Sequence, residues 1–189
     1  MKKIGWGFIG AGSIANRFIK GLAQVPDAYL AAVSSRSYDK AKSFADKYGA
    51  KVYATVEEMI LDENVDIVYV GTPHTIHREN TLLALNLGKP VLCEKPMAPN
   101  AELALEMVKT AREKKVYLME AMWTRFFPVM DKVRSWLNEG TIGKVNFVAA
   151  DFGYSEPEDP SSRLFDPNSA EGSLLDVGIY PIAFALMVF

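Results

Sequence analysis

The side chains best suited to chemistry stand where an apolar run ends, in the stretch Cys93–Pro96. Glu94 and Lys95 directly follow the apolar residues PVLC, and Pro96 comes next. Charges at the end of a buried strand are costly unless they are paired or put to use. We therefore expect Glu94 to bond to nearby backbone or to Lys95. The Lys95–Pro96 peptide bond is a candidate cis bond that would fix the direction of the lysine.

A glycine-rich loop follows the first apolar run of the chain. Its sequence, GAGSIA, fits the pattern G-x-G-x-x-A between a strand and a helix. The first glycine permits a tight turn, the second lets backbone approach a pyrophosphate, and the alanine allows close helix–strand packing. The start of the helix supplies N–H donors for phosphate. The predicted nucleotide-binding residues are Gly10, Gly12, Ser13, Ile14 and Ala15; the alternative is a purely structural turn.

The end of the second apolar run indicates which dinucleotide would bind. A site that prefers NAD usually carries Asp or Glu there, to bind the ribose hydroxyls. This chain instead offers Ser35, Arg36 and Ser37. Because a guanidinium suits a 2′-phosphate, we predict NADP over NAD, unless Arg36 is simply a solvated loop cation. Glu94 is a further candidate to bond a ribose.

The fourth apolar run ends in GTPHTIH, which contains both histidines of the chain. Ligands of doubly wound sheets lie outside the carboxyl ends of the strands, so Gly71, Thr72 and Pro73 should border the cofactor. We expect His74 and His77 to make polar contacts to cofactor or substrate, or to cap a helix without a further role. The sequence suggests no third ligand for a metal.

The elements that must position these motifs alternate between strand and helix. Near-continuous apolar strands separated by helices predict a doubly wound parallel α/β sheet, covered on both faces, over residues 1–122. The expected strands are Lys3–Ile9, Tyr29–Ser34, Val52–Tyr53, Val65–Val70, Pro90–Cys93 and Val116–Glu120. The expected helices are Ser13–Val25, Ser37–Tyr48, Val56–Leu61, His74–Leu87 and one that Asn100 caps and that runs to Lys114.

The pattern changes in residues 123–189. We expect a helix over Phe127–Glu139, an open-sheet strand over Lys144–Tyr154, a polar loop, and a buried apolar helix at the end. A second sheet is begun there and not completed. The sequence thus predicts a partial C-terminal α+β domain for substrate binding and dimerisation, in a chain that looks truncated.

Composition excludes several classes of protein. The chain has 189 residues, 49% of them apolar, and a formal net charge of −2. It lacks the basic clusters of a nucleic-acid-binding protein. Its last apolar run is too short to span a bilayer, and glycines interrupt the apolar start, so no membrane or secretion role is expected. The single cysteine, Cys93, suits a reducing cytoplasm.

Four motifs together resemble the glucose–fructose oxidoreductase / inositol dehydrogenase (Gfo/Idh/MocA) family: GAGSIA, GTPHTIH, CEKP and SLLDVGIYP. The stretch Met119–Pro128 is similar to the branch that holds dimeric dihydrodiol dehydrogenase and the NADP-dependent D-xylose dehydrogenase. Two features depart from the family pattern. Members are normally longer, and their triple glycine before the last motif is here Ala170–Glu171–Gly172.

The resemblance implies roles for particular residues. Lys95 would lie near the nicotinamide and bond the reacting hydroxyl. Tyr180 would be the acid–base group, and Asp176 would lie one turn before it. Trp123 and Arg125 would line the nicotinamide and substrate side. A free tyrosine titrates near pH 10, and a nearby ammonium would lower that pKa.

The bland alternatives for these residues are a helix N-cap for Asp176 and a core aromatic for Tyr180. The motifs and the resemblance together imply an NADP-dependent oxidoreductase that moves hydride between a sugar or trans-dihydrodiol carbon and the nicotinamide. A full-length chain would form a homodimer. The alternative is a non-catalytic NADP-binding module or an inactive fragment of such an enzyme.

Overall fold

The structure is a computed structural model and describes residues 2–189. The chain divides into two compact units, the first ending at Glu120 and the second running from Ala121 to Phe189. Among the described residues no helix is both long and apolar enough to cross a membrane.

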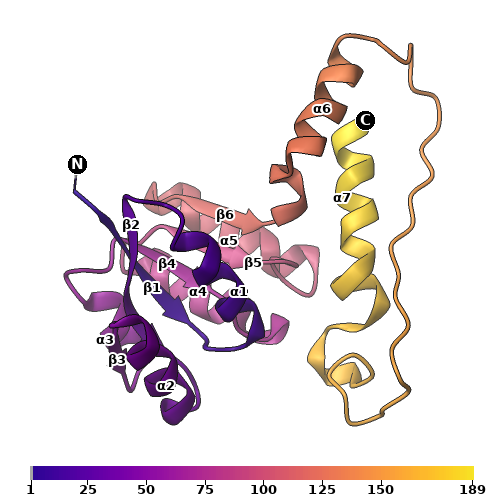
Figure 1. Ribbon diagram of the computed structural model, residues 1–189. Coiled ribbons are helices and arrows are strands. Elements are labelled where there is room, and N and C mark those ends of the chain that lie inside the picture. Colours follow the sequence, from indigo (N-terminus) through magenta and orange to yellow (C-terminus); the bar gives the residue numbers. More distant parts are fainter. Residues whose placement is uncertain (1) are drawn as a thin grey trace. The chain divides into compact units, whose positions relative to one another are not determined.

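The first unit is built on a six-stranded sheet with the order β3-β2-β1-β4-β5-β6 (Figure 1). The paired strands run parallel. The strands are β1 Ile4–Ile9, β2 Ala28–Ser34, β3 Lys51–Tyr53, β4 Ile67–Val70, β5 Val91–Glu94 and β6 Leu118–Ala121. The order reverses between β1 and β4, which is the point where such sheets bind their ligand. The predicted doubly wound sheet is confirmed.

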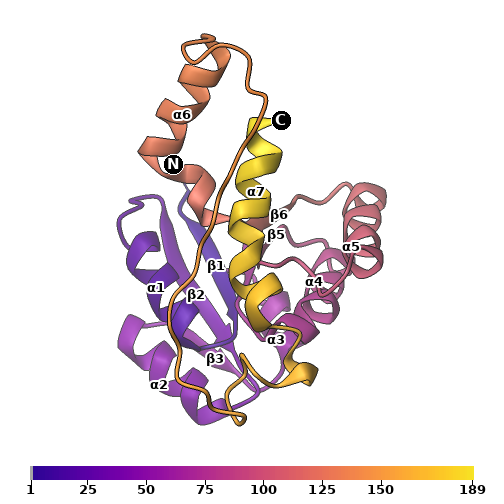
Figure 2. The ribbon, with the colours of Figure 1, turned by 90° about the vertical axis from the view of Figure 1, so that its right-hand side faces the viewer.

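Helices cover both faces of this sheet (Figure 2). They are α1 Ser13–Leu22, α2 Tyr38–Tyr48, α3 Val56–Leu61, α4 His77–Asn86 and α5 Ala101–Lys114. Because successive strand residues point to opposite faces, two cores form. Phe8 and Tyr69 pack with α1 and α2, whereas Ile9 and Val70 pack with α3, α4 and α5.

The ends of the helices follow local chemistry. Asn100 caps α5 as predicted, since its side chain accepts a hydrogen bond from Leu103 N at 3.0 Å. The helix α2 ends at Gly49, whose φ of 68° is left-handed. The helix α1 ends earlier than expected, at Leu22, because the chain turns before Pro26. His74 lies in a separate 3-10 turn, η1 His74–Ile76, that precedes α4.

The second unit is mostly helical. Its elements are η2 Trp123–Phe126, α6 Pro128–Asn138, η3 Pro167–Ser169, the π-helix η4 Ser173–Gly178 and α7 Ile179–Val188. Pro181 has no N–H to donate within α7, and the wide turn of η4 lies directly before that helix.

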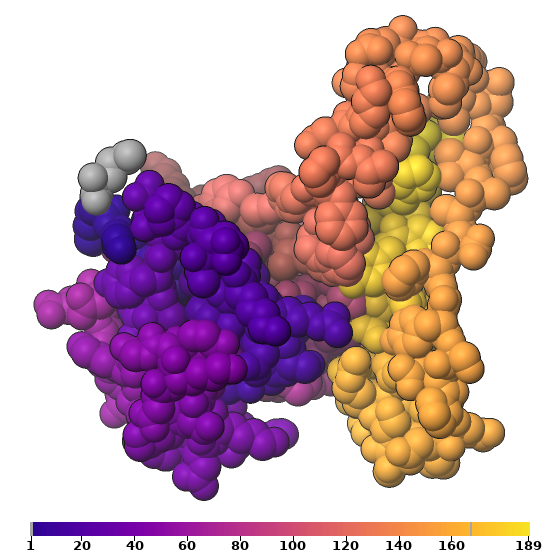
Figure 3. All heavy atoms as spheres, viewed as in Figure 1, coloured from indigo at the N-terminus to yellow at the C-terminus, as the bar shows by residue number. Residues whose placement is uncertain are grey.

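Two expectations for this unit were wrong. The strand expected over Lys144–Tyr154 is absent: residues 144–159 form neither helix nor strand. Figures 1 and 3 show them, in orange, as an extended chain. A strand needs a second strand to pair with its N–H and C=O groups. Within the described part of the chain, no strand pairs with residues 144–159. The apolar tail does form a helix, but it is not buried, since Leu186 is 76% exposed.

Candidate active site

The glycine loop joins β1 to α1 at the carboxyl ends of the parallel strands. This end of the sheet, where doubly wound folds bind their ligands, is called the ligand edge below. Gly10 has a φ of 104°, and a Cβ there would lie 2.5 Å from the carbonyl oxygen of Gly71. Gly10 N donates to Ser34 O at 2.8 Å, and Gly71 N donates to Ile9 O at 2.9 Å. Only glycine fits this crossing without strain. The loop is therefore tied to the ends of β2 and β4.

The second glycine of the loop faces open space. Gly12 is exposed, and a Cβ placed on it would meet no atom within 4 Å. It precedes α1, whose first turn has no acidic side chain. Ala15 is fully buried against the sheet. A helix start with unpaired N–H groups and room above its glycine suits a pyrophosphate.

The residues predicted to choose the dinucleotide lie at the end of β2. Arg36 is exposed, and Ser35 and Ser37 are half-buried. Ser37 is the N-cap residue of α2, yet its side chain makes no capping hydrogen bond. These three residues directly follow β2, and the glycine loop directly follows β1, so the pairing of β1 with β2 brings the two segments to the same end of the sheet.

His77 connects the end of β4 to the turn after β5. Its ring is fully buried. Nδ1 lies 2.9 Å from the carbonyl oxygen of Pro96, and Nε2 lies 2.8 Å from that of Thr72. Burial lowers the pKa of His77, although the two carbonyls oppose this shift. Both ring nitrogens therefore contact backbone, and His74 lies nearby with its ring centroid 5.4 Å away.

The charged pair at the end of β5 is buried. Glu94 is 7% exposed and Lys95 is 9% exposed. The Lys95–Pro96 peptide bond is cis, as predicted. Glu94 accepts hydrogen bonds from the Tyr69 hydroxyl at 2.7 Å and from Lys95 N at 3.3 Å. Burial raises the pKa of Glu94, against these hydrogen bonds. The expected bond of Glu94 to backbone is thus present.

Two residues of this edge were missed at the sequence level. Tyr69 holds Glu94, and Glu120 accepts a hydrogen bond from Met97 N at 2.7 Å. A tyrosine within the apolar strand IVYV was an available signal, because a buried phenol usually needs a partner. Glu120 is the next-to-last residue of β6 and Glu94 is the last residue of β5, so a carboxylate near the end of an apolar strand was a second signal.

The second unit gathers the other predicted residues around Tyr180. Trp123 Nε1 donates to the Tyr180 hydroxyl oxygen at 2.9 Å, and the two rings meet edge to face. Asp176 lies inside η4, so the expected cap role is not observed. One Asp176 oxygen lies 3.7 Å from Arg163 and 3.4 Å from the Tyr154 hydroxyl.

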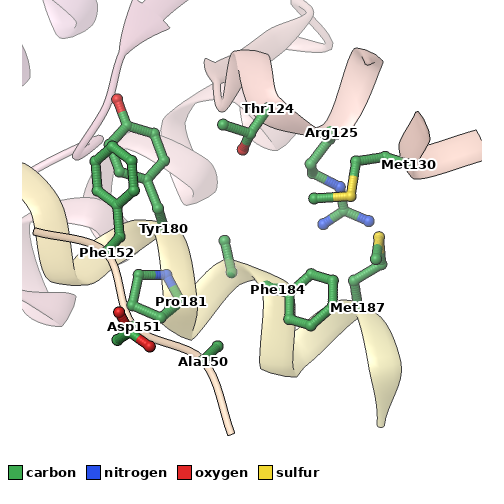
Figure 4. Close-up of a pocket in the computed structure, with 11 residues that line it drawn as sticks. Thr124, Arg125, Met130, Ala150, Asp151, Phe152, Tyr180, Pro181, Phe184 and Met187 are labelled. Carbon is green, nitrogen blue, oxygen red and sulfur yellow. The ribbon is translucent and has the colours of Figure 1, made fainter. Parts of the chain in front are cut away.

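Tyr180 also lines a pocket of about 200 Å³ within the second unit (Figure 4). Most of its wall is apolar, with two charged residues, Arg125 and Asp151. The lining residues are Thr124, Arg125, Met130, Ala150, Asp151, Phe152, Tyr180, Pro181, Ala183, Phe184 and Met187. Figure 4 shows the Arg125 side chain directed toward Met187. Tyr180 is thus a half-buried pocket residue, not a fully buried core aromatic.

None of the residues in the described range forms a group of three metal-ligating side chains. The arrangement in the first unit can instead hold an anion at the start of α1 and present an ammonium beside a buried carboxylate. The arrangement in the second unit can hold a phenol at the wall of an apolar pocket.

Comparison with known proteins gives relatives along the whole chain. A trans-1,2-dihydrobenzene-1,2-diol dehydrogenase from Mus musculus is 44% identical over 187 residues, which are 97% of this chain and 56% of that protein. The one from Xenopus tropicalis is 41% identical over 187 residues. The chain therefore spans about half the length of the curated relatives it matches.

Solved structures agree with this fold. An aldose-aldose oxidoreductase from Caulobacter crescentus, complexed with glycerol, has a TM-score of 0.90 and 32% identity, covering 99% of this chain and 58% of its own. A 3-ketoreductase from Actinomadura kijaniata, in complex with NADP and TDP-benzene, has a TM-score of 0.85 and 31% identity, with 99% and 58% covered.

Two family models match successive parts of the chain. The oxidoreductase family with an NAD-binding Rossmann fold matches residues 4–122, and the GFO/IDH/MocA C-terminal domain matches residues 130–189. The resemblance seen in the sequence motifs is thereby confirmed, and the chain belongs to the Gfo/Idh/MocA oxidoreductase family.

Proposed function

We propose that this chain is an NADP-dependent dehydrogenase that moves hydride between a hydroxyl carbon of a trans-dihydrodiol or sugar and the nicotinamide. The observation that carries the proposal is the placement of Lys95, buried beside Glu94 at the ligand edge of the same sheet that holds the open glycine loop. The named activities of the relatives, a dihydrodiol dehydrogenase and an aldose oxidoreductase, support this substrate class.

The first unit offers matching groups for each part of NADP. The N–H groups that follow Gly12 would bind the pyrophosphate, and the open space above that glycine leaves room for it. Arg36, with Ser35 and Ser37, would bind the 2′-phosphate. The turn after β4, Gly71–His74, would border the nicotinamide side. When bound, the cofactor supplies a nicotinamide ring that accepts or gives hydride.

The side chains of this protein would handle the substrate oxygen and its proton. In the oxidative direction the hydroxyl proton would pass to the Tyr180 oxygen, which must be the phenolate to accept it, and a carbonyl would form as the carbinol hydrogen leaves as the hydride that the oxidised nicotinamide accepts. Lys95 would donate a hydrogen bond to the oxygen as its negative charge develops. Trp123 would orient Tyr180 through the hydrogen bond between them, and Asp176 and Arg125 would assist on the substrate side.

We further propose the division of labour that the sequence predicts. Residues 1–122 would bind NADP, and residues 123–189 would contribute to substrate binding and dimerisation. A full-length chain would be a homodimer in the cytoplasm. The single, buried Cys93 fits a reducing compartment, since it needs no disulfide partner.

The test is turnover at the absorbance band of the reduced nicotinamide, with trans-dihydrodiols, pentoses and hexoses. We expect Lys95→Met and Tyr180→Phe each to lower kcat/KM by about 10² or more while NADPH binding is kept. Lys109→Met and Tyr38→Phe, both at exposed positions, are the matched controls. NADPH binding without turnover of any substrate would instead favour a non-catalytic NADP-binding module.

A further inference from the structure

Tyr69 is a polar residue in the apolar face of the sheet that packs on α1. Its side chain is fully buried. The ring stacks on Phe18 of α1 with centroids 4.3 Å apart and planes within 3°, and it tilts against Phe8 at 4.9 Å. A Cβ on Gly71 would lie 2.7 Å from Tyr69 Cε1. The ring is therefore held on three sides, by α1, by β1 and by the turn after β4.

This confinement aims the hydroxyl at β5. Tyr69 pairs with Leu92 in the β4–β5 register, and Glu94 lies two residues beyond Leu92 on the same face. A tyrosine is long enough to reach such a diagonal neighbour. Its hydroxyl donates to Glu94 Oε1 at 2.7 Å.

The other carboxylate oxygen of Glu94 contacts the backbone of Lys95. Lys95 N donates to Glu94 Oε2 at 3.3 Å. The carboxylate thus bridges the Tyr69 phenol and the backbone of Lys95. Burial raises the pKa of Tyr69, and the Glu94 carboxylate raises it further, so the phenol stays protonated and can donate. Burial also raises the pKa of Glu94, and the Glu120 carboxylate raises it further, whereas the hydrogen bonds from Tyr69 and from Lys95 N and the charge of Lys95 lower it. Without that bond the carboxyl would protonate at higher pH.

We propose that Tyr69 is a positioning residue for the reaction: through its hydroxyl it orients the Glu94 carboxylate, and Glu94 in turn holds the backbone that carries Lys95. This inference rests on the proposed function, because Lys95 is the group that would touch the substrate. Tyr69 itself is fully buried, so it would touch neither cofactor nor substrate.

The first experiment measures Glu94 directly. Carboxyl-labelled glutamate is introduced, and the Glu94 signal, assigned by its absence in Glu94→Gln, is followed by ¹³C NMR as pH is varied. In Tyr69→Phe the ring and its stacking remain, and only the hydroxyl is lost. We expect the Glu94 titration to move upward by about one pH unit. An unmoved titration would overturn the inference.

The second experiment measures the reaction. In Tyr69→Phe we expect the acidic limb of kcat/KM to move upward with the Glu94 titration, and NADPH affinity to change less than about threefold. In Glu94→Gln the contribution of Glu94 to that limb is lost, so adding Tyr69→Phe to it should not move the limb further. A limb that stays in place while the titration moves would make Tyr69 merely structural and overturn the inference.

The chain offers a matched control for both measurements. Tyr53 also donates to a carboxylate, Asp62, at 2.5 Å, but Asp62 follows α3 and is not at the ligand edge of the sheet. Tyr53→Phe should leave the Glu94 titration and the acidic limb in place, and an equal movement there would contradict the proposal. If the wild-type chain binds NADPH but turns over no substrate, the proposed function fails. The NMR titration then decides by itself whether Tyr69 holds Glu94.

Discussion

Arg36 is the charged residue of the three, Ser35, Arg36 and Ser37, on which the predicted preference for NADP rests. Its guanidinium is exposed at the end of β2, between Ser35 and Ser37. An acidic residue in this region would bond a free ribose, whereas a cation bonds a 2′-phosphate. The preference is therefore expected to be local to one side chain.

Replacing Arg36 by alanine should raise the Kd for NADPH by about tenfold or more and leave that for NADH almost unchanged. The reason is the loss of a charge-assisted hydrogen bond to phosphate, which is worth about 1.5–3 kcal/mol. Fluorescence titration with each cofactor measures this. Lys40→Ala, an exposed cation on α2, is the control. If Arg36→Ala kept the preference for NADPH over NADH unchanged, the prediction that Arg36 binds the 2′-phosphate would be wrong.

Asp62 is a buried carboxylate that we expect to stabilise the fold through its hydrogen bonds. It accepts hydrogen bonds from Tyr53, from Lys51 at 3.0 Å and from Asn64 N at 2.7 Å. Burial alone would raise the pKa of Asp62, but the hydrogen bonds outweigh it and hold that pKa well below its ordinary value. A depressed pKa means stability that is present above the unfolded value, about pH 4, and is lost as pH falls below it.

Asp62→Asn should accordingly lower the free energy of unfolding at pH 7 by about 2 kcal/mol. The difference from wild type should shrink between about pH 4 and pH 2, as the wild-type carboxylate loses its advantage. Urea denaturation at several pH values measures both. Asp46→Asn, which breaks only an exposed i,i+4 pair with Lys42, should cost about 0.5 kcal/mol or less. A pH-independent difference would contradict the assignment.

At the scale of elements, the β1–α1 junction contains two glycines that we expect to have different roles, one in stability and one in ligand binding. Gly10 has a left-handed φ and no room for a Cβ beside Gly71, whereas Gly12 has an ordinary φ of −81° and open space around it. The first should therefore be needed for the fold, and the second for the ligand.

Gly10→Ala should destabilise the protein by about 2 kcal/mol or more, because it adds both backbone strain and a clash. Gly12→Ala should change the free energy of unfolding by less than about 0.5 kcal/mol while weakening NADPH binding at least tenfold, since the methyl group occupies the space meant for the pyrophosphate. Thermal unfolding and cofactor titration on both variants check this. Equal effects of the two substitutions on stability would show that the distinction is wrong.

At the scale of the whole molecule, the hydrogen-bonding of the backbone differs between regions. The strands β1, β4 and β5 lie in the middle of a parallel sheet with neighbours on both sides. Residues 144–159 form no helix or strand, and Phe147 among them is 80% exposed. Local opening is easiest where backbone bonds and buried contacts are few.

Amide hydrogen exchange should therefore be slowest in β1, β4 and β5 and fastest over residues 144–159, where protection should stay within about tenfold of an unfolded peptide. The helix α6, which precedes that segment, serves as an internal reference of intermediate protection. Mass spectrometry of peptic fragments resolves these regions. Strong protection of residues 144–159 would instead indicate that they pair with another strand in solution.

Much of the first unit follows from local pattern. Apolar runs and helix signals predicted all six strands and five helices of this unit to within a few residues. This is possible because the spacing of apolar residues along a strand or helix is a local property of the sequence. The second unit was less accessible. The prediction of a strand over Lys144–Tyr154 was wrong because a strand forms only when a second strand pairs with it. Alternation of residues within one segment does not show whether such a second strand is present.

The sequence by itself predicted where the candidate site residues lie: a glycine turn after β1, a cation after β2, Glu94 at the end of β5, and Lys95 with its cis peptide bond directly after it. These are properties of short stretches. The tertiary structure alone decided which groups hold them, with Tyr69 on Glu94, His77 on the carbonyl of Pro96, and Glu120 on Met97 N. A hydrogen bond needs its atoms within about 3 Å, and residues some 20 positions apart reach that distance only when the order of the strands places their ends side by side.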